Sequence, residues 1–134
     1  MNHRDRLRDL LVERSLKRGD FVLASGARST YYIDARRTLF SSEGQFLVGQ
    51  VALEAIRDAG WKPTWAGGLT MGADPVACAL AHRSWIDGTP VEAFSVRKEA
   101  KAHGAGSRVE GGLPSGVPVV VLEDTLTTGG SALR

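Results

Sequence analysis

Two adjacent acids, Glu123 and Asp124, follow an apolar run near the end of this 134-residue chain. The run at 117–122 is nearly continuous in apolar residues, as expected of a parallel strand covered on both faces. After the acids comes a turn at 125–131 that is rich in hydroxyl groups and glycine. Open α/β sheets bind ligands at the carboxyl ends of their strands, and such a turn can cradle a phosphate at a helix N-terminus. Because the two acids repel phosphate, we expect them to accept hydrogen bonds from a sugar diol or to recruit a divalent metal.

A second group of chemically capable residues lies in the segment 97–112, which contains charged residues and four glycines but no apolar periodicity. Its basic residues could neutralise a small, highly charged anion. They could equally form an ordinary solvated loop, and the residues alone do not decide between the two. The length of the segment favours a functional or a disordered loop.

The composition excludes several classes of protein. With 43% apolar and 24% charged residues, the chain is typical of one globular domain spanning residues 1–134. A net charge of +2 and the lack of spaced aromatic residues argue against nucleic-acid binding. No apolar run reaches the roughly 20 residues of a membrane-spanning helix, and no secretory signal is recognisable, so we expect a cytoplasmic protein without a membrane partner. The single cysteine, Cys78, is predicted to lie in a helix core.

Periodicity and turn residues predict the elements that position these groups. Helices are expected at 3–17, ending before Gly19, from a Ser42 cap with Gln45 in a capping box to about Gly60, and from Asp74 to His82. Strands are expected at 21–23 and 30–34, forming a hairpin, and at 65–68, 91–96 and 117–122. The alternation predicts an α/β fold with a mostly parallel central sheet flanked by helices and with the hairpin set apart.

Four segments resemble the type I phosphoribosyltransferases, and together they resemble the orotate phosphoribosyltransferase family. They are SGARSTYYIDARR at 25–37, GGLTMGADPVA at 67–77, VRKEAKAHG at 96–104 and VVVLEDTLTTGGSA at 119–132. The resemblance implies the type I phosphoribosyltransferase fold, with the hairpin as a hood. It also implies a pentosyltransferase of pyrimidine (UMP) biosynthesis that converts orotate and phosphoribosyl pyrophosphate (PRPP) into orotidine 5-phosphate and pyrophosphate with Mg²⁺. The resemblance further implies a homodimer with shared active sites.

The resemblance also implies roles for individual residues. Glu123 and Asp124 would hold the ribose hydroxyls, with Mg²⁺ bound through PRPP nearby. Basic residues of a mobile loop would act at the neighbouring subunit's site, and on the hairpin Tyr32 and Ile33 would face the pyrimidine. The catalytic set would be Lys101, His103 and Asp124. The other substrate-binding residues would be Arg97, Lys98 and Arg37, together with the phosphate-binding Thr125, Thr127, Thr128, Gly129, Gly130 and Ser131.

The chain departs from the family pattern at three places. Ala24 and Gly72 stand where PRPP-contacting lysines are expected, and the backbone amides of 70–73 with Arg36 would replace them. The chain also ends at Arg134, early in a helix that relatives continue. We therefore expect a fold that is incomplete at its C-terminus, with reduced stability and little activity.

Two other functions remain open from the sequence. The chain could transfer the phosphoribosyl group to another base, or it could be a PRPP-binding module that regulates without catalysis. A glycine-flanked segment carrying both Lys101 and His103 favours the enzyme, because a regulatory module has no need of them.

Overall fold

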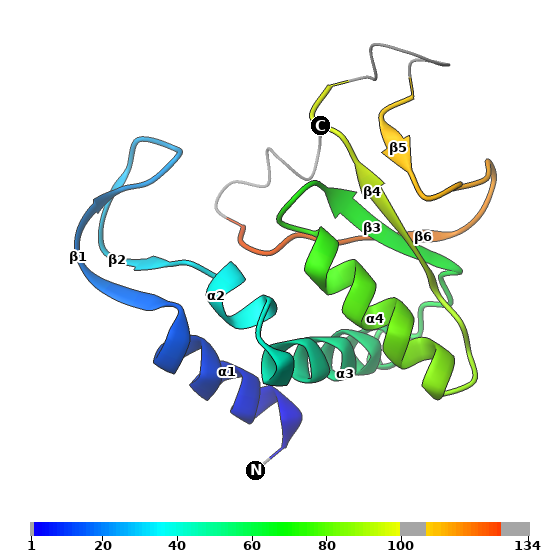
Figure 1. The fold of residues 1–134 in the computed structure, drawn as a ribbon, viewed down its shortest axis with the longest axis horizontal. Helices are drawn as coiled ribbons and strands as arrows, with labels where there is room; N and C mark the ends of the chain where they lie inside the picture. Colours follow the sequence, from blue (N-terminus) through cyan, green and yellow to red (C-terminus); the bar gives the residue numbers. More distant parts are fainter. Residues whose placement is uncertain (1, 100–106, 127–134) are drawn as a thin grey trace.

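The computed structural model describes residues 2–99 and 107–126, which form two sheets and four helices (Figure 1). Strands β1 (Leu16–Val22) and β2 (Arg28–Ile33) form an antiparallel hairpin that stands apart from the rest. The larger sheet has the order β5-β4-β3-β6. Its strands are β3 (Trp65–Leu69), β4 (Glu92–Val96), β5 (Val109–Glu110) and β6 (Val119–Val121).

The central strand β3 pairs in parallel with β4 on one side and with β6 on the other. The predicted mostly parallel α/β sheet is therefore confirmed, with β5 added antiparallel to β4. Two glycines let the neighbouring strands approach β3 closely. A Cβ at Gly67 would overlap the carbonyl oxygen of Phe94, and a Cβ at Gly68 would overlap that of Leu122.

Two of the described helices begin at side-chain caps, whereas the other two follow alanines that make no side-chain cap hydrogen bond. Asn2 accepts a hydrogen bond from the Asp5 N–H at 2.8 Å and starts α1 (His3–Arg14). Ser41 accepts from the Gly44 N–H at 3.0 Å and starts α3 (Ser42–Asp58), so the predicted cap at Ser42 is one residue late. The remaining helices are the short α2 (Arg36–Leu39), which the sequence did not predict, and α4 (Asp74–Ile86).

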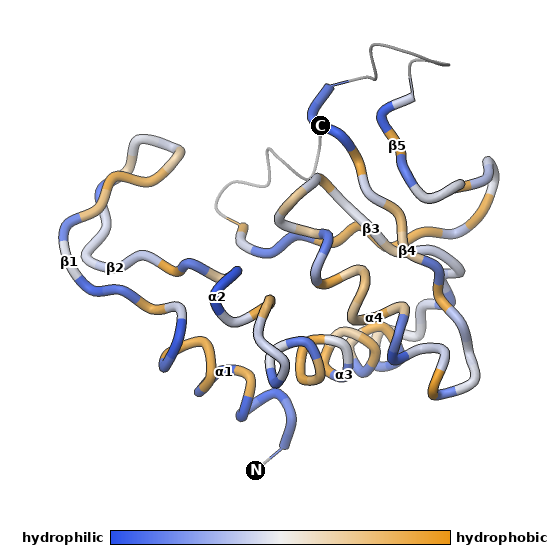
Figure 2. The backbone as a smooth tube through the Cα atoms, viewed as in Figure 1, coloured by the Kyte–Doolittle hydropathy of each residue, from blue (hydrophilic) through white to orange (hydrophobic). Residues whose placement is uncertain are grey.

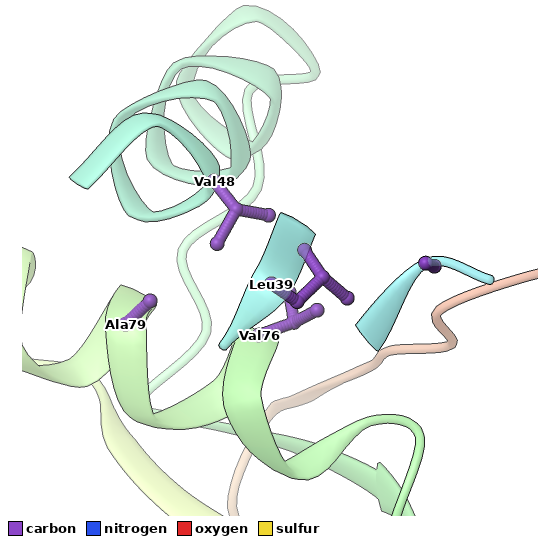
Figure 3. Packing of buried hydrophobic residues seen from close by; sticks show 5 residues of the cluster. Leu39, Val48, Val76 and Ala79 are labelled. Carbon is purple, nitrogen blue, oxygen red and sulfur yellow. The ribbon is translucent and has the colours of Figure 1, made fainter. Parts of the chain in front are cut away.

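The hydrophobic core lies between the helices and one face of the larger sheet. Figure 3 shows Leu39 of α2, Val48 of α3 and two residues of α4, Val76 and Ala79, pointing toward one another. A second cluster joins α3 and α4 to the strands through Leu53, Ile56, Ala66, Leu80 and Val91. Hydrophobic and hydrophilic residues alternate along α1 and α3 (Figure 2), as expected of helices with one buried face.

The structure corrects three predictions about where elements end and what they bury. Helix α1 ends at Arg14 because β1 begins at Leu16, so residues 16–17 are strand and not helix. The predicted capping box is absent, since the Gln45 amide donates to the carbonyl oxygens of Leu39 and Pro75 instead. Cys78 is exposed on α4 and does not belong to the core.

Strand β6 is also shorter and less covered than predicted. Val120 and Leu122 pack against the helix cluster. Val119 and Val121, which point to the opposite face, are 41% and 58% exposed. Within the described residues, β6 is thus an edge strand with one covered face. None of the described helices has the length and apolar character needed to cross a membrane.

Candidate active site

Three turns meet at the carboxyl edge of the larger sheet because β3, β4 and β6 run in parallel. Together with α2 they line a carboxyl-edge hollow of about 210 Å³, formed by Arg36, Leu69, Thr70, Gly72, Lys98, Glu123, Asp124 and Thr125. These residues come from four places in the sequence, so the hollow is built by the fold and by no single motif. Its position agrees with the ligand-binding edge of open α/β sheets.

The two acids of this hollow, Glu123 and Asp124, lie next to each other, and burial together with this proximity raises the pKa of Glu123. Burial raises the pKa of the Glu123 carboxyl above its ordinary value, and hydrogen bonding with the neighbouring Asp124 carboxyl raises that pKa further. The Asp124 N–H, 3.2 Å from the Glu123 Oε1, acts in the opposite direction on the same pKa. Asp124 Oδ1 itself accepts from the Thr125 N–H at 2.9 Å. The pair is thus a concentration of negative charge and acceptor oxygens, suited to hydroxyl donors or a cation.

The turn after β3 is tied to the start of α4 and to β4. The Thr70 hydroxyl donates to Asp74 Oδ2 at 2.6 Å, and the Thr70 N–H donates to the Val96 carbonyl at 2.8 Å. Asp74 Oδ1 is buried and has no hydrogen-bond partner among the described residues. The turn is therefore fixed next to Asp124, and its residues Thr70 and Gly72 line the hollow.

A second hollow adjoins the first at the base of the segment that follows β4. This loop-base hollow, of about 630 Å³, is lined by Thr70, Ser95, Arg97, Lys98, Glu99 and Glu110. Thr70 and Lys98 line both hollows, so the two lie side by side. The Arg97 Nε donates to Glu110 Oε1 at 2.9 Å, across the antiparallel pair of β4 and β5. Lys98 and Arg97 thus place cationic side chains next to the acids of the carboxyl-edge hollow.

Sequence comparison identifies close relatives over the whole chain. The orotate phosphoribosyltransferase of Aquifex aeolicus is 44% identical over 137 residues, which cover 100% of this chain and 74% of the relative. This chain belongs to the orotate phosphoribosyltransferase family. A relative of the same name from Bradyrhizobium is 43% identical and is covered over 72% of its length. No protein-family model matches the chain.

Solved structures agree with the family and its fold. The orotate phosphoribosyltransferase of Mycobacterium tuberculosis, solved with Fe(III) dicitrate, superimposes with a TM-score of 0.83 at 42% identity, covering 98% of this chain and 73% of that one. The same enzyme solved in complex with PRPP has a TM-score of 0.78 at 39% identity, over 98% of this chain and 70% of that one. The predicted type I phosphoribosyltransferase fold is confirmed by these neighbours.

The structure brings together some of the predicted residues of this family member. Glu123, Asp124, Thr125 and Lys98 line the carboxyl-edge hollow, and Arg97 lines the adjoining one. Arg36, which was predicted only as a substitute for a missing lysine, lines the hollow, whereas Arg37 is not among its lining residues.

Tyr32 and Ile33 lie on β2 of the separate hairpin, 44% and 39% exposed, where the Tyr32 ring lies 5.7 Å from that of Phe21. The remaining predicted residues fall outside the described part of the chain. They are Lys101, His103, Thr127, Thr128, Gly129, Gly130 and Ser131.

The donor set fits a magnesium ion that arrives with a substrate. Carboxylate oxygens are the protein ligands that Mg²⁺ prefers, and this ion is usually held by one or two carboxylates together with substrate phosphates. Glu123 and Asp124 supply two such carboxylates. The described residues contain no group of three or more His, Cys, Asp or Glu side chains that could hold a metal alone.

Sequence reasoning missed Glu110 as a partner of Arg97. The contact depends on β5, whose two residues are too few to show a period of their own. The only signal is an apolar residue, Val109, between charged neighbours just before two glycines, which is typical of a short paired strand but also of a loop.

Proposed function

We propose that this chain transfers the 5-phosphoribosyl group of PRPP to orotate, giving orotidine 5-phosphate and pyrophosphate. Family membership over the full chain carries the proposal, and the carboxyl-edge hollow supports it with groups suited to PRPP. Transfer forms a bond between a ring nitrogen of orotate and the anomeric carbon, while the bond from that carbon to pyrophosphate breaks. Both electrons of the breaking bond leave with the pyrophosphate, and the proton of the orotate ring nitrogen is released to the pyrophosphate or to water.

The acids of the hollow would hold the ribose. In this proposal Glu123 and Asp124 accept hydrogen bonds from the 2- and 3-hydroxyls, and the turn at 125–131 holds the 5-phosphate. Fixing the sugar in this way orients the anomeric carbon toward the base. It also lowers the entropy that must be lost when PRPP and orotate meet in the reactive geometry. Tyr32, Ile33 and Arg37 would contact the orotate.

The cations would act on the leaving group. Negative charge grows on pyrophosphate as its bond breaks, and fixed cations lower the barrier by neutralising that charge as it forms. Arg36, Lys98 and Arg97 are the described candidates, and Lys101 and His103 complete the proposed set. A bound Mg²⁺ would supply further charge neutralisation at the phosphates.

Because the chain alone is expected to have little activity, the direct test incubates both the chain and a version extended with a relative's C-terminal segment with orotate, PRPP and Mg²⁺, and measures orotidine 5-phosphate and pyrophosphate. Equal formation of both products supports the proposal. Transfer only to another base, or PRPP binding without either product, would replace it with one of the two other functions.

A homodimer with shared sites is the proposed assembly, and it rests on the family alone. Two variants, Lys101→Ala and Asp124→Asn, are each expected to be inactive. Mixed after subunit exchange, they should regain part of the activity, because one kind of site then carries both intact residues. No recovery after verified exchange would favour sites built within one chain.

The cytoplasmic location stays a prediction.

A further inference from the structure

Gly72 occupies the turn between β3 and α4, where its backbone does not require a glycine. The glycines of positive φ among the described residues are elsewhere, so an alanine could adopt the Gly72 backbone angles without strain. Gly72 is nevertheless buried and lines the carboxyl-edge hollow. The reason for a glycine must therefore be space and not conformation.

The space beside Gly72 is taken by the carboxylate of Asp124. A Cβ added at Gly72 would touch Asp124 Oδ1 and would lie 2.8 Å from its Cγ and 3.0 Å from its Oδ2. Non-bonded heavy atoms are most stable about 3.5–4.0 Å apart, so a methyl group there and the present carboxylate position are incompatible.

The side chain of Asp124, and not the backbone, would give way. The three atoms nearest to the added Cβ all belong to the carboxylate end of this side chain. Rotating the carboxylate away would break its hydrogen bond from the Thr125 N–H and change its direction relative to Glu123. Substitution at Gly72 should therefore cost little folding stability but should displace the acid.

We propose that Gly72 is a positioning residue for Asp124. By lacking a side chain, it lets the carboxylate lie against the turn after β3, so that the diol acceptor and this turn line one hollow. The inference rests on the proposed function, in which Asp124 holds the ribose. It also explains why a lysine is absent at this position, since the place of its first side-chain carbon is already filled.

Two substitutions separate space from charge. Gly72→Ala adds only the methyl group, while Gly72→Lys adds both the obstruction and a cation. On charge alone the lysine should strengthen the binding of an anion such as PRPP. On the geometry, both variants should weaken PRPP binding by about tenfold or more, the scale expected when a hydrogen bond to a charged group is lost.

The experiment measures PRPP affinity by calorimetry with saturating Mg²⁺ for the parent, both Gly72 variants, Asp124→Ala and the double variant Gly72→Ala/Asp124→Ala. We expect unchanged melting temperatures for the Gly72 variants and weaker binding by each. In the absence of the Asp124 carboxylate, Gly72→Ala should have no further effect, because the added methyl group then has no carboxylate to displace. A crystal structure of Gly72→Ala should show the Asp124 carboxylate displaced.

The outcomes that overturn the inference differ from those that overturn the function. If the parent binds PRPP and Gly72→Ala binds it equally well, or if the two substitutions add fully, Gly72 does not act through Asp124. If Gly72→Lys binds PRPP more tightly than the parent, charge dominates over space and the inference is wrong. If the parent does not bind PRPP, the proposed function fails, and an undisplaced Asp124 in the Gly72→Ala structure would then reject the positioning role separately.

Discussion

Acidic side chains meet opposite surroundings in the helical layer and at the carboxyl edge of the sheet. Between α1 and α3, Arg6 donates to both carboxylate oxygens of Glu43 at 2.6 and 2.9 Å, and this pairing lowers the pKa of Glu43. At the sheet edge, Glu123 stands beside another acid, and its pKa is raised. The Glu43 carboxylate is thus paired with a cation, whereas at the sheet edge two carboxyl groups lie side by side. Such a departure from local balance is typical of a binding site.

The largest effect on stability should come from the helical layer. Leu80 of α4 is fully buried between the helices and the sheet. Replacing Leu80 with alanine should lower the free energy of unfolding by about 2–5 kcal/mol, because it removes buried methyl groups and leaves a cavity. Denaturant unfolding measures this. Cys78→Ala, at an exposed position of the same helix, is the control and should change little. Equal losses from both substitutions would mean that α4 does not pack as described.

The next largest effect should be a loss of PRPP affinity, and not of stability, on substitution at the carboxyl edge of the sheet. Asp124→Asn should weaken PRPP binding by about 10- to 100-fold, since a hydrogen bond to a charged group contributes roughly 1.5–3 kcal/mol. The free protein should not become less stable, because the asparagine keeps an oxygen for the Thr125 N–H and removes a charge next to Glu123. Calorimetry with PRPP and thermal unfolding check the two halves. A variant that binds normally but unfolds earlier would assign Asp124 to structure.

Two adjacent arginines give a smaller but sharper comparison. Arg36 lines the carboxyl-edge hollow, and Arg37 is not among its lining residues, although both lie in α2. Arg36→Ala should therefore weaken PRPP binding more than Arg37→Ala does, and this difference should shrink at high salt because exposed charges are screened. The affinities of both variants at low and high salt test this. A larger loss from Arg37→Ala would move the anion site toward the hairpin.

The smallest effects concern pH and have opposite signs in the two regions. The pKa of Glu43 is lowered, so its stabilising contribution is present above its unfolded pKa and is lost as pH falls through the folded pKa. The pKa of Glu123 is raised, so its contribution is present below its unfolded pKa and is lost as pH rises through the folded pKa. The free energy of unfolding should be measured against pH. Glu43→Gln should remove the loss of stability seen as pH falls below the ordinary glutamate pKa, and Glu123→Gln should remove the loss seen as pH rises above it. Changes of the same sign in both variants would contradict the contrast.

The sequence predicted the parts of the site that depend on strand direction. Glu123 and Asp124 follow an apolar strand, and Lys98 follows another, so parallel pairing was enough to bring them to one edge. It also predicted the hairpin, because turn residues separate two short runs of strand-forming residues. These features are local, or they follow from a general rule of topology.

The sequence could not predict what depends on a neighbour's position. The apolar residues of β6 show what could be buried, but not that Val119 and Val121 face outward in the described chain. Gly72 looked like a missing lysine, and only the three-dimensional approach of Asp124 shows the space that the glycine leaves. The choice of Arg36 over Arg37 likewise depends on how α2 is oriented, which four residues of sequence do not reveal.

The most direct measurement maps where PRPP binds by hydrogen–deuterium exchange, with and without PRPP and Mg²⁺. A hollow of about 730 Å³ at the amino ends of β3 and β4, which includes Trp61 and Val91, is the internal control, because it lies at the opposite edge of the same sheet. We predict slower exchange at 69–73, 97–99 and 122–125, and no change around Trp61 and Val91. Protection confined to the amino-edge hollow, or no protection at the carboxyl edge under saturating PRPP, would contradict the assignment of the carboxyl edge as the active site.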